Sequence, residues 1–167
     1  AKKKPPVSVE VMPVRTGEWQ SSFAALGTLR ANESLELRPE VAGRVTALGF
    51  QEGASVRRGQ LMVQLDDSAA RAELNQAQAN RKLAEADLGR ARSLVASGLI
   101  AVNEVERLQA QAAVTQAAVE KARSALSKTR LLAPFDGRAG LRQFSPGELV
   151  QPGQALVTLV SLSPMKL

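Results

Sequence analysis

The chain has 167 residues, of which 44% are hydrophobic but only 3% aromatic, so its core has to be built from aliphatic side chains and Ala. Cys and His are both absent, which excludes disulfides, Cys/His zinc sites, cysteine nucleophiles and Ser-His-Asp relays. The formal net charge of +6 permits contact with nucleic acid or anionic lipid. The sequence therefore argues against an enzyme, and we expect no cofactor and no metal.

The N-terminal region begins with a basic, proline-containing tail. Residues 1–6 contain three Lys and two Pro with no apolar run behind them, which predicts a solvated linker rather than an intact signal peptide. Between Val7 and Asn32 apolar and polar side chains alternate weakly, which predicts two strands joined near Gly17. Nothing else in the chain repeats this segment, so we expect these strands to pair with a domain encoded beyond Leu167.

A sequence repeat flanks the middle of the chain. Residues 41–65 align without gaps with residues 135–159, and nine of the 25 aligned pairs are identical. Ordinary residue usage would give roughly one or two identities. The identical pairs are Gly43/Gly137, Arg44/Arg138, Phe50/Phe144, Gly53/Gly147, Val56/Val150, Gly59/Gly153, Gln60/Gln154, Val63/Val157 and Leu65/Leu159.

Both copies of the repeat have the composition of short strands joined by tight turns. Glycines stand at matching turn positions, and the segments 61–65 and 155–159 that follow them predict strands. One explanation is two unrelated β-hairpins that share glycine turns. The other, which the identities favour, is two equivalent halves of one small β-sandwich, because each half alone would expose one apolar sheet face.

The segment between the two halves has a helical composition. Residues 68–129 contain no Pro and only two Gly within a run of Ala, Leu, Gln, Glu, Lys and Arg. Steps of four and three residues predict an antiparallel helical hairpin with coiled-coil packing and arms roughly 40–45 Å long. The first seam comprises Ala70, Leu74, Ala77, Arg81, Ala84, Leu88, Ala91 and Val95, and the second comprises Val105, Leu108, Ala112, Thr115, Val119, Ala122, Leu126 and Thr129.

Capping residues predict where these helices begin and end. Asp67 or Ser68 can cap the first helix, and Gly98 suits the left-handed position after its end. Asn103 with Glu106 resembles a capping box for the second helix, and the Ala-Pro pair at 133–134 should end it.

No catalytic arrangement is evident in the sequence. Asp66 and Asp67 are adjacent carboxylates, and adjacent side chains do not face one another, so helix capping explains them better than acid–base chemistry. Asp136, followed by Gly137, is predicted to be a turn residue.

Four motifs occur in order around the predicted hairpin. Before the hairpin stand Arg-Pro-Glu-Val-Ala-Gly-Arg-Val at residues 38–45 and, within residues 53–66, the Gly, Val, Gly-Gln, Leu and Leu-Asp positions. After the hairpin stand Ala-Pro-Phe-Asp-Gly at 133–137 and Gly-x-x-Val-x-Pro-Gly at 147–153. Together they resemble the periplasmic adaptor proteins (membrane fusion proteins) of tripartite efflux pumps, in particular those of resistance-nodulation-division (RND) pumps. The resemblance covers residues 7–167.

The resemblance implies an α+β fold, in which a lipoyl-like β-sandwich built from two sequence halves is split by a long antiparallel coiled-coil hairpin, with orphan β-barrel strands at the N-terminus. The implied domain boundaries are a tail at 1–6, strands of an incomplete β-barrel domain at 7–33, lipoyl-like halves at 34–66 and 131–162, the hairpin at 67–130 and the start of a missing β-barrel domain at 163–167.

The resemblance also implies partners and a location. The family bridges an inner-membrane RND transporter and a TolC-like outer-membrane channel, and its members form a ring that is hexameric in the assembled pump. The implied location is the periplasm, with attachment to the inner membrane through a signal, lipid or anchor absent from this sequence.

In the family, the hairpin tip carries an Arg-x3-Leu-x6-Ser pattern implicated in meeting the channel. Arg90 and Leu94 match this pattern, whereas Ala101 stands where the family has Ser. The alternative is that Arg90 is one of many solvated helix arginines and Leu94 merely closes the coil. The resemblance implies a partner-binding tip formed by Arg90, Leu94, Gly98, Leu99, Ile100 and Ala101, with Arg92 and Arg107 as further hydrogen-bond donors.

Three functions are alternatives to an RND-pump adaptor. An adaptor of an ABC-type exporter would have the same architecture. A lipoyl or biotinyl carrier would place a modified Lys on the turn between the halves, but residues 65–68 contain no Lys and lead into a helix. A nucleic-acid-binding coiled coil would need a basic stripe, whereas the helix Arg and Lys are interspersed with Asp and Glu, so we expect no nucleic-acid partner.

Overall fold

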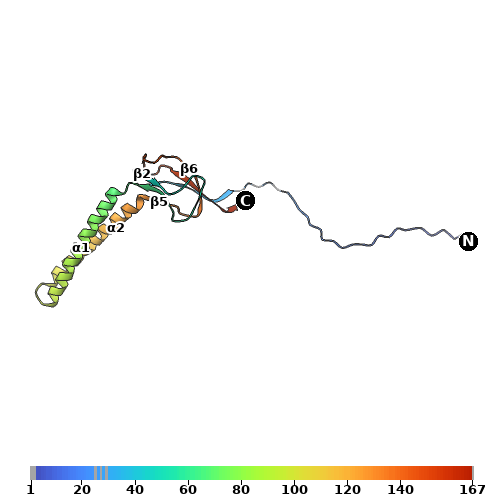
Figure 1. The fold of residues 1–167 in the computed structure, drawn as a ribbon. Coiled ribbons are helices and arrows are strands. Elements are labelled where there is room, and N and C mark those ends of the chain that lie inside the picture. Colours follow the sequence, from blue (N-terminus) through green and yellow to red (C-terminus); the bar gives the residue numbers. More distant parts are fainter. Residues whose placement is uncertain (1–2, 25, 27, 29, 167) are drawn as a thin grey trace.

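The structure is a computed structural model that describes residues 3–24, 26, 28 and 30–166. A small β-sandwich carries two long helices that project from one side of it as a hairpin (Figure 1). The N-terminal segment extends away on the other side, and residues 3–24 form no helix or strand and are exposed throughout. The two strands predicted between Val7 and Asn32 are therefore not formed in residues 3–24, because no other strand lies beside this segment to pair with it.

Eight strands in the described part of the chain form two four-stranded sheets in which all pairs are antiparallel. The first sheet has the order β1-β8-β6-β3, with β1 at Arg30–Leu37, β8 at Val157–Lys166, β6 at Gly137–Arg142 and β3 at Ser55–Val56. The second has the order β5-β4-β2-β7, with β5 at Arg130–Leu132, β4 at Leu61–Leu65, β2 at Gly43–Leu48 and β7 at Leu149–Val150.

The sequence repeat appears directly in the strand positions. Adding the repeat offset to the bounds of β2 and β3 gives the bounds of β6 and β7, and the two sheets then have equivalent strand orders. However, β3 pairs with β6 and β7 pairs with β2, so each sheet contains strands from both halves. The halves exchange strands, rather than forming one sheet each and packing face to face.

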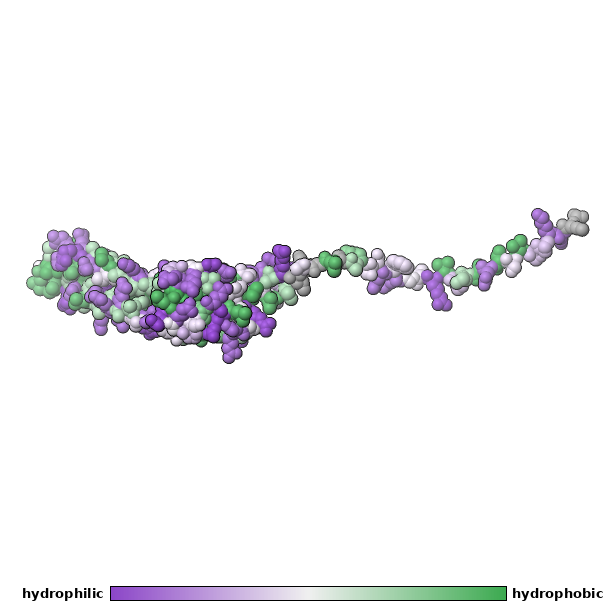
Figure 2. Space-filling model, turned by 90° about the horizontal axis from the view of Figure 1, so that it is seen from above, coloured by the Kyte–Doolittle hydropathy of each residue, from purple (hydrophilic) through white to green (hydrophobic). Residues whose placement is uncertain are grey.

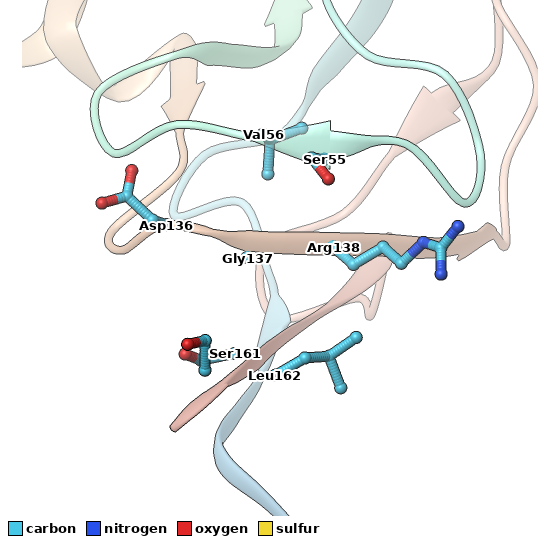
Figure 3. A pocket seen from close by; sticks show the side chains of 8 residues that line it. Ser55, Val56, Asp136, Gly137, Arg138, Ser161 and Leu162 are labelled. Carbon is cyan, nitrogen blue, oxygen red and sulfur yellow. The ribbon is translucent and has the colours of Figure 1, made fainter. Parts of the chain in front are cut away.

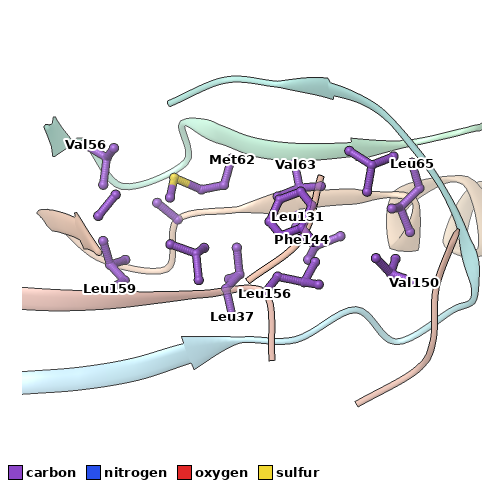
Figure 4. Close-up of a cluster of buried hydrophobic side chains, with 14 residues drawn as sticks. Leu37, Val56, Met62, Val63, Leu65, Leu131, Phe144, Val150, Leu156 and Leu159 are labelled. Carbon is purple, nitrogen blue, oxygen red and sulfur yellow. The ribbon is translucent and has the colours of Figure 1, made fainter. Parts of the chain in front are cut away.

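The core of the sandwich is aliphatic, as the composition requires, with Phe144 as its one buried aromatic side chain among the described residues. Met62 and Val63 are completely inaccessible, and the labelled side chains of both sheets point toward one another between the layers (Figure 4). Several identical pairs of the repeat lie in this core, which explains their identity: Val56/Val150, Val63/Val157 and Leu65/Leu159. Burial of these aliphatic groups is the main stabilising contribution to the sandwich.

The two helices lie between β4 and β5 in the chain and pack along each other. Helix α1 spans Ser68–Ala96 and helix α2 spans Val102–Lys128. Every residue of the two predicted seams is buried or half-buried, while most of the other helix residues are exposed. The small Ala side chains at the seam allow close approach of the helices but bury little area per residue.

The helix ends differ in part from the prediction. The side-chain carboxylate of Asp66, and not of Asp67, accepts the Ser68 N–H at 3.0 Å, and Asp67 forms a 2.8 Å ion pair with Arg71. The predicted capping box at Asn103 is wrong, because the N-cap of α2 is Ala101, two residues earlier, and Asn103 already lies inside the helix. The predicted end at 133–134 is also wrong, because hydrogen bonds to β4 draw residues 130–132 into a strand.

Near the C-terminus, Pro164 lies inside β8, whose last residues pair with the start of β1. A proline is compatible with this position because this end of β8 pairs with β1 alone, and Pro has no N–H to donate to a second neighbouring strand.

Candidate functional site

The hairpin reverses direction in five residues, 97–101, at the end farthest from the sandwich. Gly98 has a φ of +71°, which confirms the predicted left-handed position. Its N–H donates to the carbonyl oxygen of Val95 and the Leu99 N–H donates to that of Leu94, both at 2.9 Å. These two bonds form a Schellman motif, which satisfies the last carbonyl groups of α1 and makes the tip a defined turn.

The tip of the hairpin exposes several apolar side chains. Leu94 is 41% exposed, Leu99 70% and Val102 64%, while Ile100 is half-buried. Figure 2 shows hydrophobic side chains gathered at this end of the molecule, with hydrophilic ones around them. Because two long helices hold this patch away from the sandwich, it is sterically free to contact another protein.

Ion pairs hold two of the three tip arginines. Arg90 forms an ion pair with Asp87, one helical turn earlier. Arg107 donates two hydrogen bonds to the carboxylate of Glu104, at 3.0 and 2.7 Å. These bonds lower the pKa of Glu104 and raise the pKa of Arg107, so both groups are charged at neutral pH. Arg92 has no carboxylate within 4.0 Å among residues 3–24, 26, 28 and 30–166.

The six residues proposed for the tip all lie at this one end. Arg90 and Leu94 lie on the last turns of α1, Gly98, Leu99 and Ile100 form the loop, and Ala101 is the N-cap of α2. Sequence reasoning missed two features of the site. Val102 adds exposed apolar surface, and the acidic partners Asp87 and Glu104 stand three residues from Arg90 and Arg107, a spacing that the sequence already contains.

A hollow of about 510 Å³ lies in the sandwich beside β3, β6 and β8 (Figure 3). Asp136 and Arg138 lie at opposite ends of it, with Ser55 and Ser161 between. The Asp136 carboxylate accepts the Arg58 N–H at 2.7 Å, so it stabilises a turn, as predicted, although a turn of the other half. In the described part of the chain no three His, Cys, Asp or Glu side chains are placed to hold a metal ion.

Comparison with known proteins identifies the family. Residues 33–162 match the family described as "RND MFP, barrel-sandwich hybrid domain", where MFP denotes membrane fusion protein. The chain belongs to this family. The matched range includes the whole hairpin and the sandwich except for the first residues of β1 and the last residues of β8, so the family match extends over the candidate tip as well as the core.

Relatives of this membrane fusion protein domain carry names from multidrug efflux. The multidrug efflux pump subunit AcrA of Escherichia coli K12 is 33% identical over 95% of this chain and 44% of its own length. The multidrug resistance protein MdtA of Klebsiella pneumoniae is 35% identical over 86% of this chain and 39% of its own length. The chain therefore spans less than half the length of these curated relatives.

A solved structure supports the same fold. A chimera of MacA that contains the Pseudomonas aeruginosa MexA α-hairpin superposes with a TM-score of 0.77 and 26% identity, over 82% of this chain and 50% of the chimera. Neither helix of the described residues is sufficiently long and apolar to cross a membrane.

Proposed function

We propose that this chain is the barrel-sandwich and hairpin part of a periplasmic adaptor, which links an inner-membrane RND transporter to a TolC-like outer-membrane channel for drug export. The family assignment and the names of AcrA and MdtA support an RND partner over an ABC-type exporter. Attachment to the inner membrane would come from a signal, lipid or other anchor, and the transported compounds would be drugs of the kind these relatives are named for.

The proposal includes the finer organisation of the fold. The halves at 34–66 and 131–162 would be lipoyl-like, and the seams of α1 and α2 would make residues 67–130 an antiparallel coiled-coil hairpin. The segments at 7–33 and 163–167 would belong to a β-barrel domain. The exposed alternating side chains Val7, Val9 and Val11 support this part of the proposal, since they need a partner sheet to cover them.

The observation that carries the docking role is the composition of the tip. A rod about 43 Å long, at 1.5 Å per residue for the 29 residues of α1, ends in an apolar patch flanked by arginines. Exposed apolar groups supply affinity when a partner covers them, and guanidinium groups can bind carboxylates or helix-end carbonyls on a channel. The proposed contact residues are Arg90, Leu94, Gly98, Leu99, Ile100 and Ala101.

Substitutions at the tip of the full-length adaptor test this role. Arg90→Asp reverses a charge and Leu94→Ser removes apolar surface, and we expect each to abolish drug efflux while the protein is still expressed and reaches the membrane. Arg123→Asp is the matched control, because Arg123 is equally exposed but lies near the sandwich end of α2. Drug susceptibility, cross-linking to the channel and expression level are measured for all three variants.

Normal efflux by both tip variants would disprove docking at the tip, as would loss of efflux that is explained by unfolding.

Copies of the adaptor would assemble as a ring, hexameric in the pump, through heterologous contacts. We expect this chain alone to sediment as a monomer or a weakly associated species, because the remaining domains would supply much of the contact surface. A tight hexamer of this chain alone would contradict that expectation.

A further inference from the structure

A charged side chain interrupts the seam of the hairpin near its middle. Arg81 is the only charged residue at the seam positions of either helix. The positions seven residues before and after it are Leu74 and Leu88, so the repeat places an arginine where an apolar side chain is normal.

Arg81 and Gln116 form a polar layer in the seam, in which not every hydrogen-bond donor of Arg81 has an acceptor. Its Nη1 donates to the Gln116 Oε1 across the helix interface at 2.9 Å. Its Nε is buried without a hydrogen-bond acceptor, the one such side-chain atom among the described residues, although the Glu85 carboxylate lies 3.5 Å away. Gln116 also donates to Glu120, at 2.9 Å. The Arg81 side chain is 38% exposed, so this polar layer buries less apolar surface than an apolar pair of side chains at the same seam positions would.

This layer divides the apolar packing into two parts. On the sandwich side, Ala77, Val119 and Ala122 form a buried cluster, against which the half-buried Leu74 packs. On the tip side, the buried seam residues of α1 are Ala84, Leu88 and Ala91, and this part of α1 also contains Gly89, a weak helix former.

The two parts are also anchored differently. The sandwich side is tied to β4, where the Leu65 N–H donates to the Thr129 carbonyl oxygen at 2.8 Å. The tip side lies at the end of the hairpin farthest from the sandwich and ends in the turn at residues 97–101. Local opening free energies are lowest where apolar contacts are few and polar groups interrupt them.

We propose that Arg81 is a built-in weak point of the hairpin, at which the tip half opens and bends independently of the half anchored in the sandwich. This weak point allows the angle between the two halves of the hairpin to change while the half anchored in the sandwich stays fixed. It follows from the packing of the hairpin and does not depend on which partner the tip binds.

Amide hydrogen exchange on the 167-residue chain tests the proposal. In the parent protein, amides of residues 84–95 and 105–112 should exchange faster than those of 70–77 and 119–126. Arg81→Leu completes the apolar seam, so exchange in the tip half should become about tenfold slower, with little change in the sandwich half. Lys82→Leu is the matched control, because Lys82 is exposed, and it should leave both halves unchanged.

A second variant acts in the opposite direction. Gln116→Ala removes the acceptor of Arg81 and should speed exchange in the tip half. The proposal is overturned if the two halves of the parent hairpin exchange equally, or if Arg81→Leu slows both halves to the same extent. It is also overturned if Arg81→Leu leaves exchange in the tip half unchanged.

Discussion

Gly49 lies where the backbone of two neighbouring strands leaves no room for a side chain. A Cβ at this position would stand 2.0 Å from the Leu61 carbonyl oxygen, far inside normal contact distance. Gly49→Ala must therefore separate these segments and strain the 3.0 Å hydrogen bond from the Gly49 N–H to the Met62 carbonyl oxygen. We expect the free energy of unfolding, measured by urea denaturation, to fall by about 1–3 kcal/mol.

Gly89→Ala is the control for that substitution. A Cβ at Gly89 meets nothing within 4 Å, and Ala is a better helix former than Gly. The free energy of unfolding should therefore rise by up to about 1 kcal/mol. A Gly49→Ala protein as stable as the parent would show that β2 and β4 can move apart without cost.

Asp66 gives the start of α1 a pH dependence. Its carboxylate accepts hydrogen bonds from the side chain and the backbone N–H of Ser68, and these bonds lower its pKa below the ordinary value of 3.8. Because the folded-state pKa is the lower one, the stabilisation is present above pH 3.8 and is lost as the pH falls through the folded-state pKa.

Thermal denaturation across this pH range measures the effect. Asp66→Ala should lower the melting temperature by a few degrees at neutral pH, and the difference from the parent should shrink in acid. Glu73→Ala, on the exposed surface of the same helix, is the control and should show no such convergence. A difference between Asp66→Ala and the parent that persists in acid would mean that the carboxylate does not act through its charge.

At the scale of the elements, α2 allows a direct test of the seam. Val119 is 1% exposed and faces α1, whereas Val114 on the same helix is 63% exposed. Val119→Ala should lower the free energy of unfolding by about 1–3 kcal/mol, because it removes two methyl groups from a packed interface and leaves a cavity. Val114→Ala makes the same chemical change outside the interface and should alter stability by less than about 0.5 kcal/mol. Urea denaturation followed by circular dichroism at a helical wavelength compares the two, and equal effects would contradict the seam.

At the scale of the whole molecule, the sandwich does not need the hairpin for its core. None of its buried core residues comes from α1 or α2, and Gln64 and Arg130 are paired neighbours in adjacent strands. Replacing residues 66–128 by a two-residue Asn-Gly turn, which keeps Leu65 and Thr129 as the pair that flanks the turn, should therefore leave a folded sandwich. Residues 30–66 alone should not fold, because each sheet needs strands from both halves. Circular dichroism and amide chemical-shift dispersion measure both proteins, and a folded single half would contradict the strand exchange.

Local signals in the sequence were sufficient for much of this architecture. The repeat located equivalent strands because the same turn glycines and core positions recur, and Gly53, Gly59, Gly147 and Gly153 all have positive φ in the structure. The two helices were located from seam periodicity, since burial on one face imposes a spacing that the chain itself displays. The tip residues were found from their place between the helices and from a family pattern.

The tertiary structure alone decided features that depend on pairing between distant residues. The exchange of strands between the halves, and the strand at 130–132 where the helix was expected to continue, both depend on hydrogen bonds to partners far away in sequence. Arg44 shows the same point, since its guanidinium donates at 3.0 Å to the Gly147 carbonyl oxygen of the other half. Periodicity and turn chemistry report how each segment can fold, but the choice of partner strand is a competition between long-range contacts that no single segment encodes.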